Sequence, residues 1–128
     1  MLSFVLEGET PSKKNNRIVN RKTGATFPSK KYTEWHKVAK NLVQSQALMQ
    51  ARDSGFQLPI NKPCQIKMLF AHGDLSRRDS DNEATSILDL LQDCDVLADD
   101  CWQIVRELNI KNTYFQGKSF CKIVIESL

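Results

Sequence analysis

The segment RRDSDNEATSILDLLQDCDVLADD, residues 77–100, carries the densest concentration of charge in this 128-residue sequence. From residue 79 onward it holds eight carboxylates and neither lysine nor arginine. An Asp-x-Asp-Asn pattern opens this acidic run, and the pair Asp99 and Asp100 closes it. Gathering so many like charges costs free energy, so the segment predicts a bound cation or a special function.

The same segment contains a predicted helix, from which the other elements can be placed in both directions. Asp79 or Asp81 can cap this helix, whose apolar stripe is Ala84, Ile87, Leu88 and Leu91. Alternating apolar residues predict a strand before it, at residues 64–71, and two strands after it, at 104–110 and 120–125. We expect these last two strands to form a hairpin.

The N-terminal part predicts one strand, one long loop and one helix. Residues 2–7 alternate as a strand does and end at Gly8, and residues 9–29 are rich in turn formers and basic groups. We expect these to form a long loop with an irregular extended piece near residues 17–20. Residues 30–51 have helical spacing, with Ser29 as the N-cap. The fold class is therefore α+β, a single domain over residues 1–128 with a mixed four-stranded sheet and two main helices packed on it.

Composition excludes several classes of protein. No apolar run is long enough to cross a bilayer, and the N-terminus lacks the charged-then-apolar pattern of a signal peptide. The four cysteines form no C-x-x-C pair and lie far from both histidines, which argues against a zinc site and against a disulfide framework. We expect a reduced, cytoplasmic protein without membrane contact or small-molecule cofactor.

Charge is distributed unevenly along the chain. Residues 13–40 contain nine basic residues against one acid, a local charge of +8, whereas residues 79–100 carry a charge of −8. Two solvated faces of opposite sign would explain this pattern. That is the usual explanation, but a basic arm that holds a polyanion beside an acidic metal pocket would also produce it. Charge alone does not separate these interpretations.

The acidic residues have the spacing of a metal site. In an extended segment Asp79 and Asp81 point to the same side, and Asp100 lies 21 positions beyond Asp79. Convergence of the three, within one chain or with a partner subunit supplying the third, would require protonation of one carboxyl or a bound cation. Oxygen ligands of this kind suit Mg²⁺ or Mn²⁺. The alternative is that Asp79 or Asp81 caps the helix while Asp99 and Asp100 form a solvated turn.

The whole arrangement resembles the RusA family of Holliday junction resolvases, which are mostly prophage-encoded endodeoxyribonucleases. The family pattern R-R-D-x-D-N, then L-D-x-L, then D-D after a hydrophobic turn, matches without a gap at residues 77–82, 88–91 and 99–100. An early Pro-Ser-x-x-Asn has its counterpart at residues 11–15. The resemblance implies a homodimer that binds four-way DNA junctions and nicks two strands symmetrically with Mg²⁺ in DNA recombination and repair.

The resemblance also implies roles for individual residues. Asp79, Asp81 and Asp100 match the family's catalytic and metal-binding aspartates. Thr85 departs from the pattern, because the family usually has a catalytic lysine there. Either Lys13, Lys14 or Lys111 supplies the positive charge, or this member is slow, altered in substrate or inactive.

Basic and polar residues on both sides of the acidic run are candidate DNA contacts. They are Lys13, Lys14, Asn15, Arg17, Arg21, Lys22, Arg77, Arg78 and Lys111. The leading hypothesis is thus a metal-dependent nuclease acting on branched DNA. Two alternatives are a branched-DNA-binding protein of the same fold that has lost catalysis, and a small adaptor that binds another protein.

Overall fold

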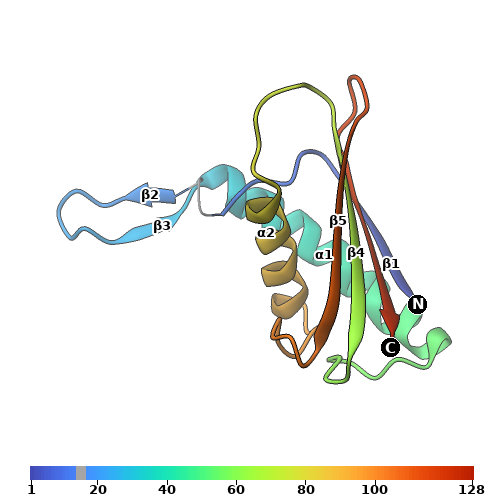
Figure 1. Ribbon diagram of the computed structural model, residues 1–128. Helices are drawn as coiled ribbons and strands as arrows, with labels where there is room; N and C mark the ends of the chain where they lie inside the picture. Colours follow the sequence, from blue (N-terminus) through green and yellow to red (C-terminus); the bar gives the residue numbers. More distant parts are fainter. Residues whose placement is uncertain (14–16) are drawn as a thin grey trace.

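Four strands form a mixed sheet in the computed structural model, in the order β1-β6-β4-β5 (Figure 1). They are β1 (Leu2–Glu7), β4 (Cys64–His72), β5 (Val105–Tyr114) and β6 (Phe120–Ser127). The structure describes residues 1–13 and 17–128, and the side chain of residue 17 lies outside that description. The predicted strands are therefore all present, with ends shifted by a few residues.

The predicted hairpin between the last two strands is wrong, because β4 lies between them. Met68 of β4 is opposite Ile110 of the parallel strand β5 and opposite Ile123 of the antiparallel strand β6. The connection from β5 to β6 crosses the end of β4 at Gly73, whose amide donates to Ser119 Oγ at 2.8 Å. A Cβ atom at position 73 would lie 2.9 Å from that oxygen and 3.0 Å from the Lys118 backbone nitrogen, so the close crossing favours glycine.

Two helices pack on one face of the sheet, as expected for the α+β class. Ser29 Oγ accepts from the Tyr32 amide at the start of α1 (Lys30–Ser54), and the left-handed Gly55 ends that helix. The second helix, α2 (Ser80–Asp93), runs beside the sheet. Neither helix combines the length and the apolar character that crossing a bilayer requires.

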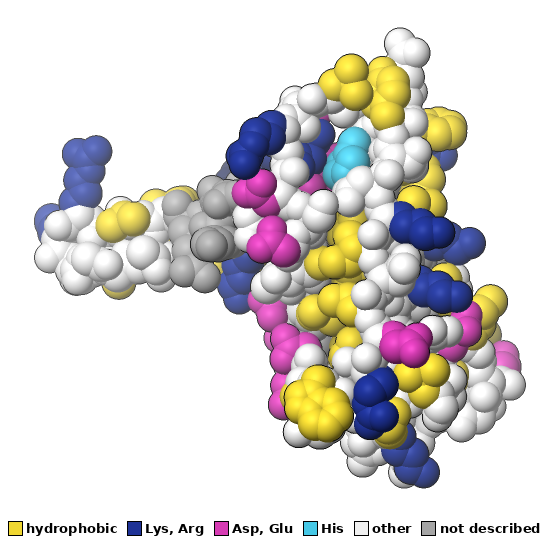
Figure 2. Space-filling model, viewed as in Figure 1, with side chains coloured by type: hydrophobic (Ala, Val, Ile, Leu, Met, Phe, Trp, Pro, Cys, Tyr) yellow, Lys and Arg dark blue, Asp and Glu magenta, His cyan; other side chains and the backbone are white. Residues whose placement is uncertain are grey.

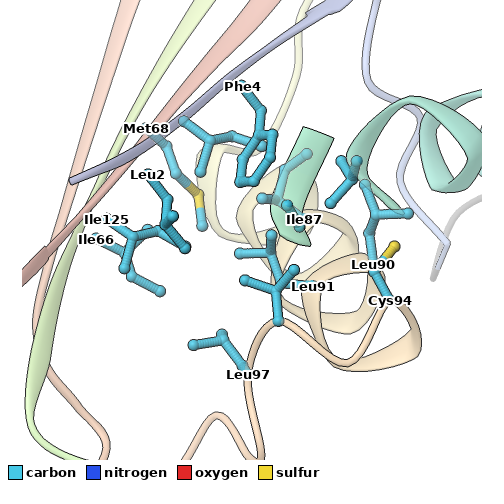
Figure 3. Packing of buried hydrophobic residues seen from close by; sticks show 14 of the residues in the cluster. Leu2, Phe4, Ile66, Met68, Ile87, Leu90, Leu91, Cys94, Leu97 and Ile125 are labelled. Carbon is cyan, nitrogen blue, oxygen red and sulfur yellow. The ribbon is translucent and has the colours of Figure 1, made fainter. Parts of the chain in front are cut away.

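The core lies between the helices and the alternating apolar residues of the strands. Figure 3 shows Leu2, Phe4 and Met68 of the sheet facing Ile87 and Leu91 of α2. Burial of such side chains contributes roughly 1.5–3 kcal/mol each. Three of the four cysteines are buried and all four are free, so the buried ones pack as small apolar residues.

The long loop expected at residues 9–29 contains a hairpin instead. Strands β2 (Arg17–Val19) and β3 (Thr26–Pro28) pair antiparallel and project from the body as an arm (Figure 1). Asn20 Oδ1 accepts from the Lys22 amide at 2.9 Å and so shapes the turn. Each strand has only three residues, too few for alternation to distinguish a strand from a loop.

Candidate active site at the start of α2

Asp79 occupies the N-cap position of α2, but its side chain does not cap the helix. The carboxylate instead lies 3.2 Å from Arg77 Nη2 and accepts from Asn82 Nδ2 at 3.4 Å. Helix capping was the alternative explanation for Asp79. The Asp79 carboxylate makes no capping hydrogen bond, so that explanation does not apply to it. The carboxylate remains partly exposed beside the Arg77 guanidinium. Its oxygens are therefore accessible, as the oxygen ligands of a metal ion must be.

Asp81 begins a largely acidic stripe along α2, exposed except at the half-buried Asp89. Residues 81, 85, 89 and 93 are four positions apart, so their side chains follow one side of the helix. Thr85 is exposed on this stripe, and its hydroxyl donates to the Asp81 carbonyl oxygen at 2.9 Å. Figure 2 shows acidic side chains running down the edge of the body next to the arm. We call residues 81, 85, 89 and 93 the acidic stripe.

Asp100 lies beyond the opposite end of α2. The 14 residues of the helix span roughly 21 Å at 1.5 Å per residue. Burial raises the pKa of Asp89, which Lys13 opposes while Asp93 and Asp100 add to the rise. The negative charge of Asp100 therefore acts electrostatically on Asp89, in the C-terminal half of the stripe. Among the described residues, Asp79, Asp81 and Asp100 do not form a group within 4.8 Å.

Lys13 is held beside the middle of the acidic stripe. Its amide donates to Ser86 Oγ, and its ammonium lies 5.9 Å from the centre of the Tyr32 ring. Its positive charge lowers the pKa of Asp89 and so acts on the middle of the stripe. Lys14 and Asn15, two further candidates, lie outside the described residues.

The two arginines before Asp79 have different surroundings. Arg77 is exposed, with Asp79 beside it, so its guanidinium faces solvent. Arg78 is mostly buried and bridges two carboxylates, Glu9 and Asp74, at 2.9 Å each. Arg77 is therefore the one available to a phosphate, whereas Arg78 holds the loop before α2 in place.

The remaining predicted DNA contacts are spread over the surface. Arg21 and Lys22 lie in the exposed turn of the arm, which begins at Arg17. Figure 2 shows basic side chains at the tip of this arm, well away from the body. Lys111 is next to Asn112, which faces α2 through Ser80, so Lys111 projects from the opposite face of the sheet.

A cluster that the sequence patterns did not single out lies just behind Asp79. Glu9, His72 and Glu83 bring one ligand atom each within 4.8 Å of one another. Burial, and then the nearby Glu9, raise the pKa of Glu83 to about 7. These residues come from three separate segments, so no spacing rule joins them. The only available signal was the unusual Glu83 on the apolar side of the helix.

Comparison with known families completes this description. The model of the endodeoxyribonuclease RusA family matches residues 8–126, nearly the whole chain. The chain belongs to the RusA endodeoxyribonuclease family. No curated protein matches it. The RusA match includes the arm, the acidic stripe, and Asp79, Asp81 and Asp100, so a nuclease activity of the general RusA kind is supported.

Proposed function

We propose that this RusA-family chain is a Mg²⁺-dependent endodeoxyribonuclease that nicks four-way DNA junctions in pairs, as a homodimer, during recombination and repair. The observation that carries the proposal is the Asp79 carboxylate, free of helix capping and held 3.2 Å from Arg77. This arrangement places a carboxylate that can bind a metal ion beside a guanidinium that can attract phosphate. The four free cysteines are compatible with the reducing cytoplasm.

The donors present fit a hard divalent cation. Asp79, Asp81 and Asp100 offer carboxylate oxygens, which Mg²⁺ prefers, with Mn²⁺ as a close substitute. These residues would hold the ion where it could lower the pKa of a coordinated water and offset negative charge on the phosphate. Because α2 separates Asp100 from the other two within one chain, we propose that Asp100 of one subunit completes the site of the other.

Lys13 is the best candidate for the positive charge that the family places at the position of Thr85. Thr85 makes only a local bond to its own helix, whereas the Lys13 ammonium faces the acidic stripe. A fixed ammonium at that point would stabilise negative charge developing on the cleaved phosphodiester. Lys111 is a poorer candidate because it projects from the other face of the sheet.

DNA is held by the exposed cations. Arg77 contacts phosphate beside the cleavage site, and Arg21 and Lys22 contact a more distant part of the duplex from the tip of the arm. Arg78 serves a different purpose, since Glu9 and Asp74 already satisfy its guanidinium. Arms placed on two subunits would reach two branches of one junction.

The test is cleavage of a synthetic four-way junction labelled on each strand in turn, with Mg²⁺ or Mn²⁺. Wild-type protein should give nicks at symmetric positions in two opposite strands. Asp79→Asn, Asp81→Asn and Asp100→Asn should each abolish nicking while junction binding is retained. Asp53→Asn, at an exposed carboxylate beside the end of α1, is the matched control and should cleave normally. Cleavage that survives all three active-site changes would refute the proposal.

A second candidate function is branched-DNA binding without catalysis. Thr85 favours it, because a hydroxyl bonded to the Asp81 carbonyl oxygen supplies no positive charge. Tight, salt-sensitive junction binding with no nicks in either metal would support this function over the nuclease. The absence of any salt-dependent DNA binding would exclude both and favour a protein-binding adaptor.

A further inference from the structure

Three segments distant in the sequence meet at Glu9, His72 and Glu83. Glu9 follows β1, His72 ends β4, and Glu83 lies in the first turn of α2. One carboxylate oxygen of each glutamate and one ring nitrogen of the histidine lie within 4.8 Å of each other. This is the only such group of three among the residues that the structure describes.

The two ring nitrogens of His72 both face oxygen atoms. Nδ1 lies 2.7 Å from Glu9 Oε1, and Nε2 lies 2.8 Å from Asn112 Oδ1. Asn112 Nδ2 donates to Ser80 Oγ at 3.0 Å, which leaves Oδ1 as the atom that accepts from Nε2–H. The neutral imidazole would then turn a lone pair on Nδ1 toward a carboxylate. That arrangement is favourable only with a proton or another cation between the two.

The carboxylates leave acceptor capacity unused. Glu83 is only 4% exposed, and its Oε2 is buried without a hydrogen-bond partner. Glu9 Oε2 is likewise buried and without a partner. Arg78 occupies only Oε1 of Glu9, so Oε2 is still available. Unpartnered, buried carboxylate oxygens beside one histidine are costly unless a proton or a metal ion satisfies them.

We propose that Glu9, His72 and Glu83 bind a divalent transition-metal ion, Zn²⁺ or Mn²⁺, at a site separate from the aspartate site. One imidazole nitrogen and two carboxylates are ligands that these ions accept, whereas Mg²⁺ prefers oxygen ligands alone. Asn112 supplies the outer hydrogen bond that metal-binding histidines make through their second nitrogen. A cavity of about 190 Å³, lined by Glu9, Glu83, Arg77 and Asp79, gives access to both carboxylates.

The position of this site gives it a structural effect on the nuclease centre. Its ligands join the loop after β1, the end of β4 and the first turn of α2. The turn that carries Asp79 lies directly against them, at the same cavity. A bound ion would therefore fix the start of α2 without taking part in cleavage.

The experiment measures metal bound per chain after equilibration with Zn²⁺ and gel filtration, with Mn²⁺ paramagnetic resonance as a second readout. Wild-type protein should retain one Zn²⁺ per chain in the presence of excess Mg²⁺. The triple variant Asp79→Asn, Asp81→Asn, Asp100→Asn should retain it too, which separates this proposal from the nuclease assignment. Glu83→Gln, Glu9→Gln and His72→Ala should each weaken binding by roughly 100-fold or more, because losing even an outer-shell partner typically costs about 10- to 100-fold.

His36→Ala is the matched control. His36 Nε2 also lies 2.8 Å from a carboxylate, Asp93 Oδ2, but no third ligand completes that pair among the described residues. Its loss should leave the stoichiometry at one. The proposal is overturned if wild-type protein retains no Zn²⁺, if Mg²⁺ displaces it, or if both near-isosteric glutamine variants bind as the wild type does.

Discussion

The backbone amide of Lys13 donates to Ser86 Oγ at 3.2 Å, and the same hydroxyl donates to the Pro11 carbonyl oxygen at 2.7 Å. Ser86 is fully buried in the middle of α2. One hydroxyl thus attaches the first loop to the helix that carries the acidic stripe. This attachment is what brings Lys13 close to Asp89.

Replacing Ser86 by alanine should lower the free energy of unfolding by about 1–3 kcal/mol, because a buried carbonyl and a backbone amide lose their partner. Urea denaturation followed by circular dichroism measures the change. Ser45→Ala is the control, since the Ser45 hydroxyl bonds the Leu42 carbonyl oxygen on an exposed side of α1. If the two variants had the same free energy of unfolding, the Ser86 hydrogen bonds would make no net contribution to stability.

Lys13→Met should reduce junction nicking by roughly tenfold or more, because it removes a positive charge aimed at the acidic stripe. Lys37→Met removes an exposed lysine of α1 and should leave the rate nearly unchanged. Adding Thr85→Lys to the Lys13→Met chain should restore cleavage, because it returns an ammonium to the stripe. Full activity of Lys13→Met would exclude Lys13 from this role.

Mixing inactive variants tests whether two subunits share one site. Asp79→Asn and Asp100→Asn homodimers should both be inactive. In a mixed dimer with shared sites, one centre receives both substitutions and the other receives none. Co-refolding the two variants should then restore nicking at one strand per junction. No recovery in a mixture shown by native mass spectrometry to contain mixed dimers would place all three aspartates in one subunit.

The arm should contribute mainly non-specific electrostatic affinity. Replacing Arg21 and Lys22 by alanine should weaken junction binding at low salt. If each makes one phosphate contact, the slope of log affinity against log salt should fall by about 2. Fluorescence anisotropy over a salt series measures this slope. A slope equal to that of the wild type would mean that the tip of the arm does not reach DNA.

The metal-free protein should lose stability as pH rises between about 4.5 and 7. The pKa of Glu83 is raised from 4.5 to about 7 in the folded state, so below pH 4.5 the carboxyl is protonated in both states and costs nothing. As pH rises, the unfolded state ionises first, and the free energy of unfolding falls until the folded carboxyl ionises as well. The full difference is roughly 3 kcal/mol.

Glu83→Gln removes this ionisation and should therefore stabilise the chain relative to wild type at pH 8 but much less at pH 4.5. Thermal melts at several pH values in the presence of a chelator measure the difference. A constant difference between the two proteins across this range would show that the pKa of Glu83 is not raised.

Periodicity predicted the larger elements because each buries one face. Leu2, Phe4 and Leu6 alternate along β1, and Ile87 and Leu91 lie one turn apart on α2, so both patterns follow directly from burial. Strand order does not follow in the same way. The inward residues of β6 fit beside β4 as well as beside β5, and short connections favour neighbours in sequence. The pairing of β4 with both β5 and β6 shows that the chain crosses the end of β4 before β6 begins.

The candidate site was predictable to the extent that its residues are close in sequence. Arg77, Asp79 and Asp81 lie within five positions, and the structure keeps them together at the start of α2. The separation of Asp100 from Asp79 and Asp81 depends on the direction that the chain takes after α2. The local sequence of that turn does not predict this direction. Glu9, His72 and Glu83 meet only through tertiary packing, so no local pattern could have joined them.

The central position of β6 has a consequence for synthesis of the chain on the ribosome. This C-terminal strand is the one that pairs with both β1 and β4. Until its residues leave the exit tunnel, β1 has no strand to pair with and β4 has only β5. The sheet therefore closes only once residues 120–127 have emerged, and a chain truncated before residue 120 would expose the unpaired edges of β1 and β4 to aggregation.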